Sequence, residues 1–113
     1  MSHIIKDNQG VNIEKLEMPI LSIIPIVKAL YESMDVPFKI TCGFQNRGWW
    51  SYHNFGLAID TKVMHIDNPE KRIKLFDLIF RTMPDNYDVV FEKDHIHIEY
   101  DPPFMKYFKP EEK

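Results

Sequence analysis

Apolar residues recur at helical spacing in the first third of the chain and alternate with polar residues further along. The spacing predicts a helix over about residues 20–34. Its apolar positions are Leu21, Ile24, Val27, Leu30, Tyr31 and Met34. Pro25 lies inside this stretch, so either the helix kinks there or Pro25 opens it as a first-turn residue. Pro37 ends the segment, and the alternation of β-forming residues after it predicts a strand over residues 38–42.

The second half of the chain predicts three more strands and one more helix. Residues 56–63 have the pattern of a strand. Asn68-Pro69-Glu70 then combines a capping side chain, a proline at the first helical position and an acid in the first turn, which predicts a helix start. This helix should end before Pro84. We expect its apolar face to comprise Ile73, Phe76, Ile79 or Phe80, and Met83. Residues 87–92 and 95–100 predict two strands joined by a turn at 92–94.

The order helix, strand, loop, strand, helix, hairpin is typical of a small α+β domain, with helices packed on one face of an antiparallel sheet. The 113 residues fit a single domain, with its core at about 20–100 and irregular termini. Hydrophobic residues make up 44% of the chain and charged residues 27%, the balance of a folded globular protein.

Charge and composition exclude several classes of function. Fourteen Lys and Arg against seventeen Asp and Glu argue against a nucleic-acid binder with a basic surface, and disfavour a nuclease. No apolar run reaches the ~20 residues of a membrane span. The first ten residues are polar and lack the apolar core of a signal peptide, which predicts synthesis in a cytoplasm. The single cysteine, Cys42, excludes a disulfide framework and a multi-cysteine zinc site.

A loop rich in aromatic and polar residues spans 43–54 and contains Trp49 next to Trp50. Adjacent tryptophans in a polar loop either cover one end of the core or line a substrate groove.

Histidine and aspartate are the residues that could hold a metal. His95 and His97 alternate on the last predicted strand, so their side chains leave the same face. His53 lies in the loop, and Asp60 follows seven residues later in a predicted strand. Zinc in hydrolases typically takes three nitrogen or oxygen ligands and keeps a fourth position for water. Two histidines and one aspartate fit that number, although spacing alone also allows a surface histidine pair and a capping or salt-bridged Asp60.

Two sequence motifs extend this pattern. Residues 51–60 follow S-x-H-x-x-G-x-A-x-D, and residues 94–99 follow D-x-x-H, then an apolar residue and Glu, with H-x-H inside. Together they resemble the zinc D-Ala-D-Ala carboxypeptidases and peptidoglycan endopeptidases of the M15 type, whose metal core the hedgehog signalling domain shares. The resemblance covers about residues 20–100. It implies a hedgehog- or DD-peptidase-like fold.

The resemblance also implies roles for individual residues. His53, Asp60 and His97 would be the zinc ligands. Asp94 matches the catalytic carboxylate, which takes a proton from the attacking water and passes it to the leaving amine. His95 matches the residue expected beside the metal, where it stabilises the oxyanion of the tetrahedral intermediate.

Some roles stay open. Glu92 is a second carboxylate that could replace Asp94 as the base. Ser51 would lie at the substrate end of the site, or else cap the loop. Gly56 and Ala58 are expected to be small so that the backbone packs closely under the metal.

Two departures from the family pattern bear on the substrate. Gln45 stands where the family usually has a carboxylate-binding arginine, so that charge is missing unless Arg47 supplies it. This favours internal peptide cross-links over a free D-Ala-D-Ala terminus as substrate. Cys42 replaces a small hydroxyl residue and is expected to be a buried strand residue.

The sequence therefore predicts a single-domain zinc metallopeptidase that hydrolyses peptide bonds in bacterial peptidoglycan, without nucleic-acid or membrane partners. A phage or prophage cell-wall-degrading enzyme, an endolysin, would fit these features. The alternative is a catalytically inactive zinc-binding structural or binding module on the same fold.

Overall fold

A computed structural model describes residue 6, residues 10–45 and residues 51–103 of the chain. Its elements, in chain order, are α1 (Met18–Ser33), β1 (Ile40–Cys42), the 3₁₀ turn η1 (Tyr52–Phe55), β2 (Ala58–Lys62), α2 (Pro69–Thr82), β3 (Tyr87–Phe91) and β4 (His95–Tyr100). This is the predicted α+β arrangement, with each predicted helix and strand present and most strands shorter than expected.

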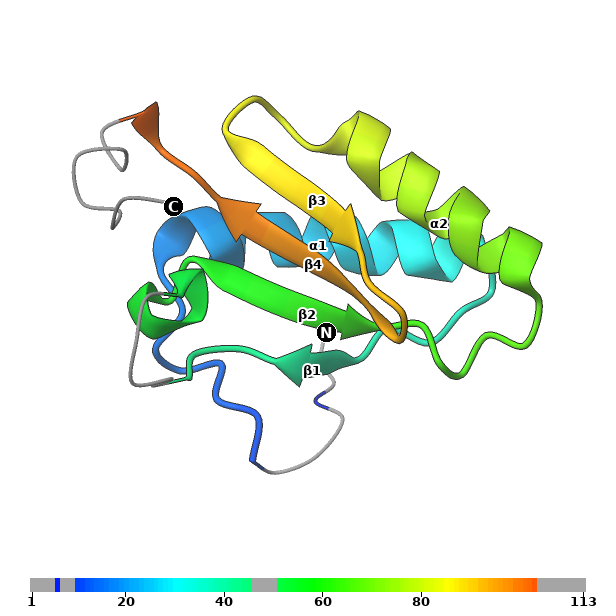
Figure 1. Cartoon of the computed structure of the whole chain (residues 1–113), viewed down its shortest axis with the longest axis horizontal. Helices are drawn as coiled ribbons and strands as arrows, with labels where there is room; N and C mark the ends of the chain where they lie inside the picture. The colour runs from blue at the N-terminus through cyan, green and yellow to red at the C-terminus, as the bar shows by residue number, and fades with distance from the viewer. Residues whose placement is uncertain (1–5, 7–9, 46–50, 104–113) are drawn as a thin grey trace, which may run out of the picture.

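The four strands form one antiparallel sheet in the order β1-β2-β4-β3, as seen in Figure 1. Both helices pack on the same face of this sheet: α1 crosses behind it, and α2 lies against α1 and β3. The opposite face carries no helix of the described residues, which confirms the predicted one-sided packing.

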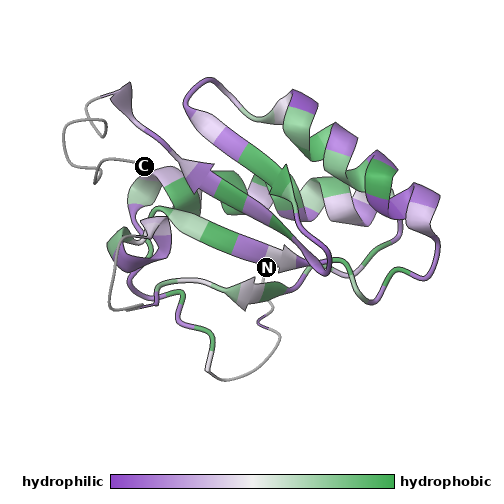
Figure 2. Cartoon of the chain, in the orientation of Figure 1, coloured by the Kyte–Doolittle hydropathy of each residue, from purple (hydrophilic) through white to green (hydrophobic). Residues whose placement is uncertain are grey.

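Alternation along the central strands separates the two faces. Ile59 pairs with Ile98, and Thr61 pairs with Ile96, and all four side chains are fully buried towards the helices. Asp60 pairs with His97 between them and therefore points to the open face. Figure 2 shows this mixture of apolar and polar positions along β2 and β4.

The first helix follows its apolar pattern through a proline. It begins at Met18, has Pro19 in its first turn and continues past Pro25 to Ser33, so Pro25 does not open it. Pro25 is exposed, on the side away from the core, where the hydrogen bond that it cannot donate is least costly. The buried face of α1 consists of Ile20, Ile23, Ile24, Val27 and Tyr31.

The start of α2 is the one predicted from Asn68-Pro69-Glu70. The side-chain oxygen of Asn68 accepts a hydrogen bond of 2.9 Å from the Glu70 amide, which satisfies one of the free N–H groups of the first turn. The helix ends at Thr82, before Pro84.

The apolar face of α2 agrees only in part with the expected one. Leu75 and Ile79 are fully buried, four residues apart on one side of the helix. Ile73 is 59% exposed, so the prediction that placed it on the core face was wrong, and of the alternatives Ile79 and Phe80 it is Ile79 that lies in the core, with Phe80 57% exposed. Ile73 precedes Leu75 by two residues, which places it on nearly the opposite side of a helix with 3.6 residues per turn.

Gly56 joins the loop of the candidate site to the segment that precedes α1. It has φ of +69°, a left-handed conformation in which a side chain is strained, and a Cβ there would lie 2.3 Å from the Lys15 carbonyl oxygen. The Glu17 amide donates a hydrogen bond of 2.9 Å to the Gly56 carbonyl. The close packing that requires glycine is therefore against residues 15–17. Ala58 is fully buried against Tyr52.

We expect Gly56→Ala to destabilise the protein by about 2 kcal/mol or more, because it combines left-handed strain with a backbone clash. Urea unfolding monitored by circular dichroism measures this change. Glu14→Ala, at an exposed position nearby, is the control and should change the free energy of unfolding by less than ~0.5 kcal/mol. Equal unfolding midpoints for the two variants would contradict the assigned role of Gly56.

Candidate metal centre

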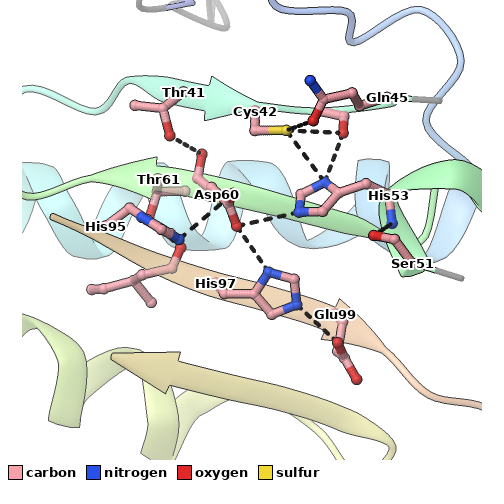
Figure 3. A network of polar contacts seen from close by, with 12 residues as sticks. Thr41, Cys42, Gln45, Ser51, His53, Asp60, Thr61, His95, His97 and Glu99 are labelled. Atoms are coloured by element: carbon pink, nitrogen blue, oxygen red, sulfur yellow. Dashed lines mark hydrogen bonds and ion pairs between the residues drawn. The ribbon is translucent and has the colours of Figure 1, made fainter. Parts of the chain in front are cut away.

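Side chains of metal-ligating types meet on the open face of the sheet (Figure 3), among them those of Cys42, His53, Asp60 and His97. Asp60 lies in the middle on β2, with Cys42 of β1 paired to it on one side and His97 of β4 on the other. Residues directly opposite one another in an antiparallel pair point to the same face. The fourth side chain, His53, reaches them from η1.

Asp60 is the residue on which the histidines converge. His53 Nε2 lies 3.4 Å from Asp60 Oδ1, and His97 Nδ1 lies 2.8 Å from the same oxygen. The two imidazole rings are 5.2 Å apart between centroids. His53 and Asp60 are buried, at 3% and 6% exposure. The structure thus brings together the three residues that the sequence predicted as zinc ligands.

Each of these histidines has its other ring nitrogen bound to the protein. His53 Nδ1 donates to the Gly43 carbonyl at 2.8 Å, and His97 Nε2 donates to Glu99 Oε1 at 2.8 Å. Hydrogen bonds of this kind fix the orientation and tautomer of metal-binding histidines. Glu99 was missed as a site residue, although its place two residues after His97 on a strand puts it on the same face.

Local backbone features hold His53 in place. The Ser51 hydroxyl caps η1 by accepting a hydrogen bond of 3.2 Å from the His53 amide, which agrees with its expected capping alternative. Gly43, whose carbonyl binds the ring, packs so tightly that a Cβ there would lie 2.1 Å from the Asn12 carbonyl oxygen. The glycine therefore allows residues 12–13 to pack against the loop.

Asp94 and His95 form a connected pair at the edge of the same site. His95 Nδ1 donates to Asp94 Oδ1 at 2.6 Å, and His95 Nε2 lies 3.6 Å from Asp60 Oδ2. Asp94 is in the turn before β4, and its side chain is 60% exposed. Glu92 is exposed, and its backbone amide donates a hydrogen bond to the His95 carbonyl. Of the two carboxylates considered as the base, Asp94 is the one that contacts a site residue.

The residues expected at the substrate end are described in part. Gln45 is exposed, and its backbone amide donates a hydrogen bond of 3.2 Å to the His53 carbonyl. Arg47, Trp49 and Trp50 lie outside the described residues.

Cys42 belongs to the site rather than to the core. It is half-buried, not buried as expected, and its sulfur lies 3.6 Å from His53 Nδ1 and 3.5 Å from Gln45 Oε1. Ligand atoms of Cys42, His53 and Asp60 all lie within 4.8 Å of one another. These three residues form a group that could hold a metal ion.

The charges of the site are strongly coupled. Burial lowers the pKa of His53, but the hydrogen bond and charge of Asp60, together with the contact with Cys42, outweigh it and raise that pKa to about 10. Burial also lowers the pKa of His97, but the hydrogen bonds and charges of Asp60 and Glu99 outweigh it and raise that pKa to about 9. Burial also opposes ionisation of Asp60, yet hydrogen bonds from His53 and His97 hold the pKa of its carboxyl far below the usual range. Without a metal, both histidines are therefore protonated at neutral pH.

We expect binding of zinc at pH 7 to release at least about two protons, one from each histidine, because only an unprotonated histidine nitrogen can bind a metal. Zinc affinity should accordingly rise with pH towards the raised pKa values of His53 and His97. Titration calorimetry in buffers of different ionisation enthalpy measures the number of protons released. A zinc-binding enthalpy that is the same in all buffers would contradict protonation of the two histidines.

Comparisons of the chain with models of protein families, with curated proteins and with solved structures find no match. Among the described residues, no helix combines the length and apolar character that crossing a membrane requires. What the chain does must therefore be argued from the geometry of the site and the two sequence motifs.

Proposed function

We propose that this protein is a single-domain zinc metallopeptidase that hydrolyses peptide bonds in bacterial peptidoglycan, on a hedgehog- or DD-peptidase-like fold. One observation carries the proposal: nitrogens of His53 and His97 lie within 3.4 Å of the same carboxylate oxygen of Asp60, while their outer nitrogens are bound to Gly43 and Glu99. Two oriented imidazoles and a carboxylate are a donor set typical of catalytic zinc.

The position of the donors supports zinc further. Asp60 and His97 are mounted on paired strands, which hold side chains more rigidly than loops do. A bound zinc ion supplies Lewis-acid polarisation of the scissile carbonyl and lowers the pKa of water so that it can attack near neutral pH.

Asp94 is suited to proton transfer. An aspartate carboxylate is ionised at neutral pH and can accept a proton, and the hydrogen bond from His95, which lowers the pKa of Asp94, makes it a weaker base than a free aspartate. One of its oxygens binds His95, and a carboxylate has further lone pairs for a second partner. His95, held at Nδ1 by Asp94, directs Nε2 towards the site, where a developing oxyanion could be stabilised.

The substrate would approach along the helix-free face of the sheet. A cavity of about 220 Å³ borders the site between β1, Gln45 and residues 10–12. We propose that it receives part of the peptide next to the scissile bond.

Digestion of purified peptidoglycan tests this function directly. The protein, loaded with zinc, should release fragments with new peptide termini that mass spectrometry identifies, and the metal-free protein should release none. Intact peptide stems and cross-links after incubation with the zinc-loaded protein would refute the proposal.

One observation favours the alternative, an inactive zinc-binding module. Cys42 forms a group of possible ligands with His53 and Asp60, next to His97, and zinc sites closed by four protein ligands are usually structural. The digestion experiment separates the two functions, because such a module would bind zinc without releasing fragments.

Substrate choice should follow the charge near the loop of residues 43–45. A free terminal carboxylate needs a cationic partner, ideally a bidentate arginine, and Gln45 supplies no charge. We expect internal cross-links to be cut with a higher kcat/KM than a free D-Ala-D-Ala terminus, and Gln45→Arg to narrow this difference.

The test is kcat/KM on the two substrate types for wild type, Gln45→Arg and Arg47→Ala. A strong wild-type preference for the free terminus that Arg47→Ala abolishes would reverse the prediction and make Arg47 the carboxylate anchor.

A further inference from the structure

A break in strand pairing brings Cys42 onto the metal-binding face. Ile40 of β1 pairs with Thr61, so regular antiparallel pairing would place Cys42 opposite Ile59, on the core face. An irregularity between Ile40 and Cys42 shifts the register, and Cys42 pairs with Asp60 instead. Bulges of this kind often redirect a side chain next to an active site.

The shift completes a row of three ligand-type residues across the sheet. On β2, Asp60 pairs with Cys42 of β1 on one side and with His97 of β4 on the other. The three side chains share the open face. His53 lies over this row: its Nδ1 is 3.6 Å from the Cys42 sulfur, its Nε2 is 3.4 Å from Asp60 Oδ1, and one ligand atom from each of these three residues lies within 4.8 Å of the other two. The sulfur is therefore placed beside the same imidazole and carboxylate that would bind zinc.

We propose that Cys42 supplies a fourth, thiolate ligand to the metal bound by His53, Asp60 and His97. This inference rests on the proposed function for the other three ligands. Thiolate is a preferred ligand of zinc and of softer divalent metals, and four protein ligands complete a tetrahedral site. The thiol proton passes to solvent when the sulfur binds.

Coordination by Cys42 has two consequences. The ion is held more tightly than by three ligands, and its fourth position is occupied until the thiolate leaves. Cadmium and other soft ions should compete with zinc better than they would at a site of nitrogen and oxygen alone.

Cobalt(II) in place of zinc reports the ligand directly. Wild-type protein loaded with cobalt should show an intense near-ultraviolet sulfur-to-cobalt charge-transfer band, which Cys42→Ser abolishes. Because the chain contains one cysteine, the band can only arise from Cys42. Cys42→Ser should also weaken zinc binding by at least about tenfold, the smallest effect typical even of residues that only support a ligand. Thr41→Ser, the neighbouring position on the same strand, is the matched control and should keep both the band and the affinity.

The possible outcomes distinguish failure of the Cys42 ligand from failure of the metal site as a whole. Wild-type protein that binds cobalt without the sulfur band would overturn the role of Cys42 and leave the three-ligand site in place. An unchanged zinc affinity in Cys42→Ser would do the same. No metal bound by folded wild-type protein would overturn both.

Discussion

Asp94→Ala is expected to keep zinc and fold but to lose peptidase activity by about 10²- to 10⁴-fold, the range typical of general acid–base residues. Asp94 is the carboxylate that binds His95, which in turn reaches Asp60 at the centre of the site. Because its side chain is 60% exposed, its removal should cost little stability. The measurement is kcat on a peptidoglycan fragment, with zinc content and unfolding midpoint determined on the same samples.

Glu92→Ala is the matched control for this prediction. Glu92 is an exposed carboxylate two residues away, and its backbone rather than its side chain contacts His95. It should retain nearly full activity. An inactive Glu92→Ala beside a nearly normal Asp94→Ala would show that the base is assigned to the wrong carboxylate.

His97→Ala is expected to reduce zinc affinity by at least about 100-fold and to abolish activity with it. His97 Nδ1 is 2.8 Å from Asp60 Oδ1, and its loss removes one of three ligands, which should cost more than the 10- to 100-fold of a supporting residue. Competition with a chromogenic chelator measures the affinity.

His65→Ala is the control, since His65 lies outside both motifs and binds the Pro37 carbonyl on another part of the fold. It should keep wild-type zinc affinity. Equal affinities for His97→Ala and wild type would remove His97 from the ligand set.

The strand positions of Asp60 and His97 could be predicted because strand periodicity is simple, whereas their grouping in one site was expected from the resemblance of the two motifs. Asp60 and His97 lie on long, regularly paired strands, where alternate residues share a face. The capping pattern of Asn68 placed the start of α2 correctly for a similar reason, since it depends on neighbouring residues alone.

Predictions failed where tertiary packing decides between equivalent local patterns. The second helix has apolar residues on more than one side, and its contacts with β3 and α1 bury Leu75, which was not expected, and leave Ile73 exposed. The prediction that Cys42 is buried failed for another reason. The side of the sheet on which Cys42 lies depends on an irregular pairing between β1 and β2, which the alternation of residues in the sequence does not reveal.

The carbonyl of Gly43 was likewise invisible in the sequence, because backbone groups have no residue-specific pattern. Gly43 contacts His53 through this carbonyl and packs closely against Asn12. Orientation of a ligand by backbone therefore needs the folded structure.

Anomalous diffraction at the zinc absorption edge, from crystals of zinc-loaded protein, tests the zinc centre most directly because it locates the ion. The expected result is one strong peak per chain, within bonding distance of His53, Asp60 and His97. A peak elsewhere, for example among the clustered carboxylates of Asp88, Glu99 and Asp101, would contradict it, as would folded protein without a peak.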